Sequence, residues 1–360
     1  MRSHAQLLES IHRWHAGFWK KERTDRPPIG VYKEEAYLPI RFLRRPFLHD
    51  TVGPTEVGDS LAMTEYEFAF ARHSIPTDDF IFFSAPWRGI PWLEACCGCQ
   101  VRFSEGSLAP ASFVGSPKEF AEIPIPAANG WLNRLRSETL RLHAAQPFDC
   151  WISPPTLRGP SDVLSAMRGL SNFYLDLYDD PESIAQAAAR VNELLIRAVH
   201  LHYSIVSPKQ GGYGHFFGYW APGKTISIQE DVMGLCSPGL YRDIFMPCNA
   251  ALVRRLGNYV LFHLHSTGCR HYKHVLDIPG IAGIELSVET VGPTLDELVP
   301  VFREILERSR LMLHVLSGFE QLPGILRKLP WQGLSVFIPD RFISSDQRWK
   351  SFVQDVSRKD

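Results

Sequence analysis

The sequence has no apolar run approaching the roughly 18 residues that a membrane-spanning helix requires, although 45% of its 360 residues are hydrophobic. It also lacks an excess of charge of either sign, because 38 Lys and Arg residues oppose 39 Asp and Glu residues. Without a basic stripe to hold phosphates, nucleic acid is not an expected partner. The N-terminus mixes charged and apolar residues and has no secretory signal core, so we expect a cytoplasmic protein that does not insert into membranes.

A disulfide framework is not expected either. The seven cysteines are an odd number, are scattered and follow no export signal, which is typical of reduced thiols. Cys96, Cys97 and Cys99 lie close together, but no second cysteine cluster completes a metal site with them. Because unpaired cysteines are often buried, packing is the favoured interpretation of this cluster. No GxGxxG or P-loop sequence follows the first apolar run, which disfavours an open nucleotide-binding sheet.

Eight short apolar runs predict β-strands, and helical periodicity fills most of the intervals between them. Asp180 followed by Pro181 is typical of a helix start and opens a predicted helix over 181–206. Thr294 and Glu297 match a capping box before another helix. This alternation favours a (β/α)8 TIM barrel as one domain over 1–360, with an N-terminal helical segment at 1–26 and a loop-rich insertion at 86–130 after the second strand. The predicted strands are 29–32, 80–84, 148–153, 225–230, 259–265, 281–288, 311–316 and 334–339.

Two histidines end the strand-like run YVLFHLH, which covers 259–265. Alternate side chains of a strand share a face, so His263 and His265 should point the same way with Cα atoms about 6 to 7 Å apart. The next predicted strand carries Glu285. Active sites of such barrels lie at the carboxyl ends of the strands, and two histidines with one carboxylate match the ligands of an open catalytic zinc site. Histidines that form hydrogen bonds within the core are the alternative interpretation.

Three further residues are candidate ligands of the same metal. His314 and Asp340 end two later strands, and Cys269 follows the histidine pair in HSTGCRH. Cys269 would begin the next helix, where the helix N-terminus favours a thiolate. A site built from imidazole and carboxylate suits zinc but also iron, manganese or nickel.

Gln229, Glu230 and Asp231 end the fourth predicted strand and are candidate catalytic residues. Strand alternation sends Glu230 to one face and the other two to the opposite face, so one set should point into the barrel mouth. There it could bond to substrate or to the groups around a metal. The alternative is that these residues cap a helix or lie in a loop.

Four residues are candidate substrate-binding groups. Arg158 and Asp162 follow the third predicted strand and could hold an anionic group, with a salt bridge between loops as the alternative. Tyr213 and Trp220 belong to the aromatic loop GGYGHFFGYW, which could cover a flat or apolar ligand. Aromatic clusters of this kind also form by packing alone, and that alternative stays open.

Three segments of the chain resemble the uroporphyrinogen decarboxylase superfamily in sequence, order and spacing. They are TLRGPSDVLSAMRGLSNFYLDLYDDPESI, SIQEDVMGLCSPGLYRDIFMPC and HLHSTGCRHYKHVLDIPGIAGIEL, and the likeness covers most of the chain from about Pro27 onward. This superfamily also contains zinc-dependent methylcobalamin:thiol methyltransferases. The resemblance implies a TIM barrel, a divalent metal such as zinc, a small-molecule substrate and a corrinoid as methyl donor. A corrinoid protein is then a candidate partner, and a homodimer is a candidate assembly.

The chain departs from the decarboxylases at two places. Where they carry RQAGRYLP, this sequence has VYKEEAYLP at Val31–Pro39, whose acids would repel the carboxylates of a porphyrinogen. Where they carry an FSDIL-like strand, it has FFSAPW at Phe82–Trp87, without the aspartate that holds the pyrrole NH groups.

The methyltransferase branch is closer to this chain. Its members use a His-x-Cys pair where this sequence has His263 and His265. The related cobalamin-independent methionine synthases add a glutamate that Glu285 resembles, and a final PDC where this chain reads PDR. The resemblance thus implies a metal site in which imidazole and carboxylate replace most of the thiolates.

We therefore expect a metal-assisted methyl or one-carbon transfer linked to a corrinoid. One alternative is decarboxylation of uroporphyrinogen or a related polycarboxylate, with Lys33, Arg88 and Arg158 gripping the carboxylates. The other is a non-catalytic barrel that binds a corrinoid or an aromatic ligand.

Overall fold

Parallel strands separated by helices form the centre of the fold. The computed structural model describes residues 4–32, 51–56, 79–86, 89–104, 107–123, 129–257, 259–343 and 345–357. Its largest sheet has six strands, all parallel, in the order β1-β13-β12-β11-β10-β9, so their carboxyl ends share one edge. The strands are β1 (Ile29–Tyr32), β9 (Ile226–Gln229), β10 (Val260–His265), β11 (Gly283–Val288), β12 (Leu311–Val315) and β13 (Leu334–Pro339).

Two more parallel strands, β3 (Phe82–Ser84) and β6 (Cys150–Ile152), pair with each other. A parallel bridge between Arg158 and Gln229 links the segment after β6 to the end of β9. On the other side, the backbone N–H of Ile29 in β1 donates to Asp79 Oδ2, just before β3, over 2.8 Å. The β3–β6 pair is thus connected to both outer strands of the six-stranded sheet. All eight predicted strands are present, with ends that differ by no more than about two residues.

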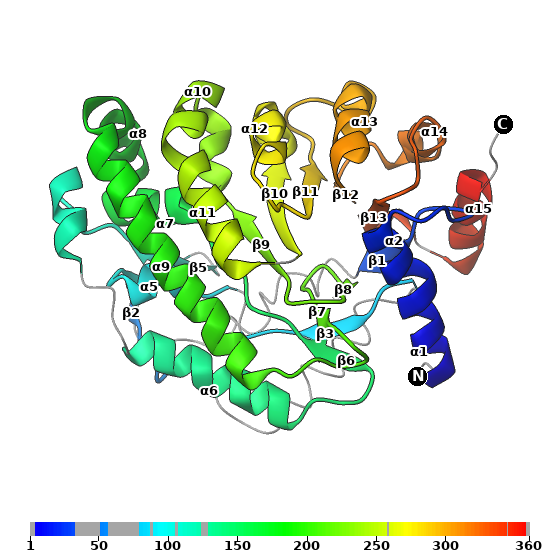
Figure 1. The fold of residues 1–360 in the computed structure, drawn as a ribbon, viewed down its shortest axis with the longest axis horizontal. Coiled ribbons are helices and arrows are strands. Elements are labelled where there is room, and N and C mark those ends of the chain that lie inside the picture. Colours follow the sequence, from blue (N-terminus) through cyan, green and yellow to red (C-terminus); the bar gives the residue numbers. More distant parts are fainter. Residues whose placement is uncertain are drawn as a thin grey trace.

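Helices follow most of the strands, and Figure 1 shows α9, α11, α12, α13 and α14 along the outer side of the strands. α9 (Pro181–Ile205) begins as predicted, because the Asp180 side chain accepts a hydrogen bond from Ser183 N over 3.2 Å. The Thr294–Glu297 capping box also forms, but α13 starts only at Val299. No helix in the described ranges is long and apolar enough to cross a bilayer. Of the helices along the outer side, α11 spans Met246–Leu256, α12 Tyr272–Leu276, α13 Val299–Arg308 and α14 Leu322–Arg327. The described chain also contains α6 (Gly130–Ala144), α7 (Pro160–Arg168), α8 (Leu170–Asp179), α10 (Pro238–Leu240) and α15 (Asp346–Ser357), with short turns η4 (Asp231–Leu235), η5 (Tyr241–Phe245), η6 (Ser266–His271), η7 (Phe319–Gln321) and η8 (Asp340–Phe342).

Side chains along the strands alternate between two apolar cores. The outer core lies between strands and helices and includes Val31 and Val336. The inner core is formed from the opposite faces of the strands and includes Phe80 and Phe337, whose rings stack with centroids 5.6 Å apart. Gly30 is required beside them, because a Cβ at this position would lie 2.3 Å from the Phe80 ring.

The N-terminal segment and the aromatic loop meet where β3 and β6 begin. α1 (His4–Ser10), η1 (Ile11–Ala16) and α2 (Gly17–Lys20) lie within the segment predicted to be helical. The Trp19 indole donates to the carbonyl of Trp220 over 2.7 Å, and the Trp220 N–H donates to His15 Nδ1 over 3.3 Å. The aromatic loop forms a hairpin of β7 (Tyr213–Gly214) and β8 (Trp220–Ala221), and Trp220 packs in one cluster with Ile81 and Trp151.

The predicted insertion at 86–130 contains more regular structure than the sequence suggests. It includes α5 (Trp92–Cys96), β4 (Gln100–Ser104), β5 (Ser107–Ala111) and η3 (Pro117–Glu122). β4 pairs antiparallel with β5 on one side and with β2 (Thr51–Val52) on the other. Pro110 lies in β5, at the edge of this small sheet, where the missing N–H of a proline is tolerated. The many Pro and Gly residues of this segment conceal the strands from a reading of the sequence pattern.

Candidate metal centre

Three side chains at the carboxyl ends of β9 and β10 bring potential metal-ligand atoms together. The Nε2 atoms of His263 and His265 lie 3.1 Å apart. Asp231 Oδ1 is 3.7 Å from the first and 3.4 Å from the second. All three ligand atoms lie within 4.8 Å of one another, and no other such group of three occurs in the described part of the chain. The His263, His265 and Asp231 side chains are 11%, 27% and 35% exposed, so the group opens to one side.

Strand alternation and register explain why these side chains meet. His263 and His265 are two residues apart on β10 and therefore share a face. The register pairs His263 with Gln229 of β9 and with Glu285 of β11. Asp231 is two residues beyond Gln229, and the Gln229 amide donates to Asp231 Oδ2 over 2.6 Å. The carboxylate is thereby held on the same side as the histidines.

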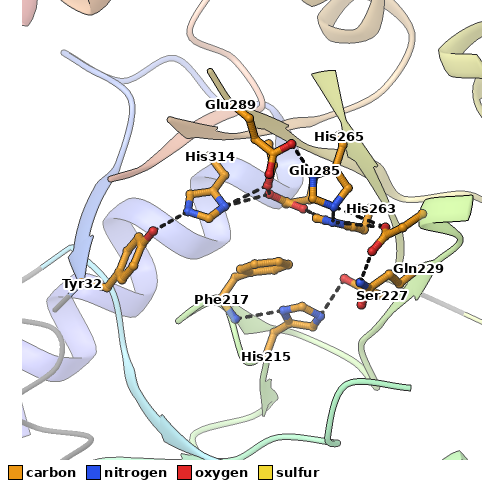
Figure 2. A network of polar contacts seen from close by, with 12 residues as sticks. Tyr32, His215, Phe217, Ser227, Gln229, His263, His265, Glu285, Glu289 and His314 are labelled. Atoms are coloured by element: carbon orange, nitrogen blue, oxygen red, sulfur yellow. Dashed lines mark hydrogen bonds and ion pairs between the residues drawn. The ribbon is translucent and has the colours of Figure 1, made fainter. Parts of the chain in front are cut away.

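A second carboxylate lies behind each histidine, as Figure 2 shows. Glu285 Oε2 contacts His263 Nδ1, and Glu289 Oε2 lies 3.1 Å from His265 Nδ1. An ionised carboxylate only accepts hydrogen bonds, so in both imidazoles Nδ1 must carry the proton. Metal-binding histidines have this arrangement, because a proton fixed on one ring nitrogen leaves the other free to bind.

Three electron-rich atoms therefore face one another. When both imidazoles are neutral, each presents a lone pair at Nε2 beside the anionic oxygen of Asp231, and such atoms repel unless a proton or a metal cation lies between them. Burial acts to raise the pKa of Asp231, but the hydrogen bond from His265 and the charge of His263 lower it to about 2. Burial acts to lower the pKa of His263, but the Glu285 carboxylate raises it to about 9, so a proton takes the place of a cation in the metal-free cluster. The residues thus fit a divalent metal.

The donor group contains Asp231, which the sequence suggests as a catalytic residue, in place of Glu285, the predicted third ligand. Glu285 faces His263 directly across the β10–β11 ladder, so its carboxylate reaches the nearer ring nitrogen, Nδ1, and not Nε2. The alternation of Gln229 and Asp231 in the sequence places these two residues on one face and leaves open whether that face or the face of Glu230 points into the site. It does not indicate which nitrogen each acid meets.

Glu230, the third predicted catalytic residue, lies between the end of β9 and the start of η4. Its carboxylate accepts hydrogen bonds from the Asn249 side-chain amide over 2.8 Å and from Ser161 N over 3.2 Å. Burial raises the pKa of Glu230 to about 7. These contacts tie the end of β9 to α7 and α11.

The three additional candidate ligands lie outside the donor group. His314 Nδ1 is 3.6 Å from Glu285 Oε1, behind the carboxylate that contacts His263. Asp340 begins η8 directly after β13. Cys269 is half-buried in η6, and burial raises the pKa of its thiol, which is opposite to the expected effect of a helix N-terminus.

Arg158 and Asp162 are both engaged with other parts of the protein. Arg158 forms an ion pair with the buried Glu94 over 3.0 Å, as the salt-bridge alternative predicts. Asp162 Oδ1 accepts a hydrogen bond from a backbone N–H of η4 over 3.0 Å, which connects α7 to the turn that carries the metal-site aspartate. Lys33 and Arg88, the other cations of the decarboxylase alternative, lie outside the described residues.

The aromatic loop, which the sequence suggests as a cover for a ligand, reaches the site through Phe217. Tyr213 packs edge-on against Tyr203 with ring centroids 4.9 Å apart, and Trp220 packs where β3 and β6 begin, so both lie away from the carboxyl ends of the strands. Phe217, at the tip of the loop, lies beside His263, with ring centroids 6.3 Å apart. Tyr213 and Trp220, the two predicted substrate-binding residues of this loop, both pack against other aromatic side chains.

Sequence reasoning missed Glu289, Ser287 and Tyr32. The first two had a recognisable signal, because Glu285, Ser287 and Glu289 recur with the strand period of two and so share a face. Tyr32 had none, since it lies on β1, far from the histidines in sequence.

A methyltransferase from Methanosarcina mazei has a similar structure. The similarity covers 93% of this chain and 91% of the other, with a TM-score of 0.59 and 15% sequence identity. At this identity the likeness establishes a common fold, with a parallel sheet and many helices, and leaves the chemistry to the side chains. No protein-family model and no curated protein matches the sequence.

Proposed function

We propose that this chain is a metal-dependent transferase that moves a methyl or one-carbon group to an acceptor held at Asp231, His263 and His265. The observation that carries the proposal is the convergence of their three ligand atoms within 4.8 Å, with a carboxylate behind each histidine. Two imidazoles and one carboxylate suit zinc, the metal we propose, and also iron(II).

A closed (β/α)8 barrel, formed as a single domain over 1–360, is part of the proposal. Three observations support it: eight parallel strands, contacts that join the β3–β6 pair to β1 and β9, and an inner core distinct from the outer one. In such a barrel the carboxyl ends of the strands form the mouth, where catalytic groups gather. The histidine pair ends β10 at this mouth.

The surrounding side chains prepare the site for a Lewis acid. A divalent metal bound there would lower the pKa of a coordinated thiol or water and so supply a nucleophile at neutral pH. Glu285 and Glu289 keep both Nε2 atoms free by accepting the Nδ1 protons. Gln229 holds Asp231 by donating to its second oxygen, and the Phe217 ring lies beside His263 with ring centroids 6.3 Å apart.

Methyl transfer, with a corrinoid as donor carried by a partner protein, is favoured over decarboxylation. The sequence resembles a superfamily with corrinoid-linked members, and the structurally similar protein is a methyltransferase. A decarboxylase for polycarboxylates needs free cations, whereas Arg158 is paired with a buried carboxylate. The proposal therefore names a thiol or a similar soft nucleophile as the acceptor.

Metal content is the first test of the proposal. Purified protein should contain about one metal ion per chain by inductively coupled plasma mass spectrometry, since the described part of the chain offers one such cluster. Asp231→Asn should lose most of this metal, because an amide oxygen is a neutral and weaker ligand. Asp243→Asn is a matched control, because this exposed carboxylate pairs with Arg242 outside the cluster. Wild-type protein without stoichiometric metal contradicts the proposal.

Turnover is the second test. The zinc-loaded protein should demethylate methylcobalamin in the presence of a thiol, and the visible absorbance of the corrinoid monitors this reaction. Asp231→Asn should abolish the change and Asp243→Asn should preserve it. Stoichiometric metal combined with corrinoid binding but no turnover of any thiol would favour the non-catalytic barrel instead.

A further inference from the structure

A chain of hydrogen bonds runs from the metal centre to Tyr32. Glu285, whose Oε2 contacts His263, accepts at Oε1 from Ser287 Oγ over 3.0 Å. Ser287 Oγ is 2.9 Å from His314 Nδ1, and His314 Nε2 is 2.7 Å from the Tyr32 hydroxyl. Figure 2 shows Tyr32 and His314 on the far side of Glu285 from the histidine pair. The chain joins β10, β11, β12 and β1 through the inner side of the sheet.

The proton positions along this chain follow from the groups themselves. Ser287 has one hydroxyl proton, and it donates that proton to the Glu285 carboxylate. The Ser287 oxygen must then accept from His314 Nδ1–H. Burial lowers the pKa of His314 to about 4, so the ring is neutral and its Nε2 accepts from the Tyr32 hydroxyl. Every hydrogen bond therefore points toward Glu285.

We propose that Tyr32 is a positioning residue of the metal centre. The Tyr32 hydroxyl donates to His314 and so fixes the orientation of the His314 ring. The ring in turn orients the Ser287 hydroxyl, and Ser287 orients the Glu285 carboxylate. That carboxylate holds the proton on His263 Nδ1. His263 Nε2 is thereby kept available for a metal. This inference rests on the proposed function, because it assigns Tyr32 a role at the same metal centre.

Packing around Tyr32 separates the effect of its hydroxyl from that of its ring. The ring is 3% exposed and stacks on Phe337 with centroids 4.4 Å apart, and Phe337 lies against His314 at 5.3 Å. Tyr32→Phe keeps these ring contacts and removes the hydroxyl that donates to His314. The variant should therefore keep its fold, while the His314, Ser287 and Glu285 side chains lose the hydrogen bond that fixes their orientation.

Zinc affinity, measured by competition with a chelating dye, tests the proposal. Groups that bond directly to a metal-binding histidine alter affinity about 10- to 100-fold, and Tyr32 is more remote, so Tyr32→Phe should weaken zinc binding about three- to tenfold. The visible spectrum of the Co2+-substituted protein should shift as well, since it reports ligand orientation. Tyr219→Phe is the matched control, because its hydroxyl bonds to Ser335 in the same inner core over 3.1 Å.

Combining Tyr32→Phe with Ser287→Ala tests whether the effect travels through the chain. If it does, Tyr32→Phe should reduce zinc affinity little once Ser287 has been replaced, because the hydrogen-bond connection to Glu285 is already broken. The inference would be overturned if Tyr32→Phe left the zinc affinity unchanged, or if Tyr219→Phe reduced it equally. It would also be overturned if the losses of zinc affinity in Tyr32→Phe and Ser287→Ala added in the double variant. Absence of bound zinc in the wild-type protein would instead overturn the proposed function, and the two failures are thus distinguishable.

Discussion

Replacing Glu285 should weaken the metal centre far more than replacing Glu289, although each carboxylate lies behind one histidine. The Glu285 side chain is 2% exposed and the Glu289 side chain 35%. A buried carboxylate acts through a medium of low effective dielectric, whereas water and salt screen an exposed one. Glutamine keeps the shape of glutamate and can still accept from Nδ1, so each substitution removes mainly the charge.

The expected magnitudes follow from this difference in burial. We expect Glu285→Gln to weaken zinc binding about 30- to 100-fold, or about 2 to 3 kcal/mol, which is the upper part of the range for such groups. Glu289→Gln should cost about threefold, as for other exposed charge pairs. Competition with a chelator measures both losses, and about 0.5 M salt should shrink only the smaller one. Equal losses, or a larger loss for Glu289→Gln, would refute the reasoning from burial.

Three further predictions concern groups outside the site. Burial lowers the pKa of His202 to about 3, so the unfolded chain binds a proton that the native state excludes. The free energy of unfolding should therefore fall by up to about 1.4 kcal/mol per pH unit from about pH 6.5 toward pH 3. Urea unfolding of the His202→Gln variant should lack this pH-dependent loss of stability. Burial raises the pKa of Cys96 and of Cys99 to about 12. Iodoacetamide at about pH 8 should therefore leave both thiols unmodified in the native protein and label them only after denaturation. Labelling of either thiol in the native protein would contradict its burial. Gly30→Ala should lower the melting temperature, because overpacking against Phe80 should reduce the free energy of unfolding by about 1 to 3 kcal/mol. Gly324→Ala in α14 is the control: its added Cβ meets open space, so the melting temperature should not fall.

Strand positions and the shared face of the histidines could be predicted because both depend on local pattern. An apolar run such as 259–265 is long enough to define a strand, and alternation then places His263 and His265 together without knowledge of the neighbouring strands. Asp180 and Pro181 likewise set the start of α9 through contacts within one turn. Each of these features is decided by residues close in sequence.

The ligand assignment could not be predicted, because it depends on the register between strands. Glu285 and Asp231 both belong to faces that the pattern identifies, but only the pairing of His263 with Glu285 decides which nitrogen the glutamate contacts. Tyr32 reaches His314 across 282 positions of sequence, so no local pattern could connect them. The small sheet of β4 and β5 was missed for another reason: an edge strand tolerates proline, which in a sequence pattern normally argues against a strand.

The two sides of the donor group differ in rigidity, and this difference indicates where an acceptor would enter. His263 is held within β10 and covered by Glu285 and Phe217, so its position is set by ladder bonds and packing. Asp231 begins a short 3-10 turn, is the most exposed of the three donors and is steadied by the side chain of Gln229. A residue beyond the end of a strand is held by fewer backbone bonds and opens at lower free energy. Under the proposed function, a thiol acceptor should therefore displace or reorient Asp231 and leave the histidine pair in place, so replacing Asp231 should alter acceptor binding more than replacing either histidine.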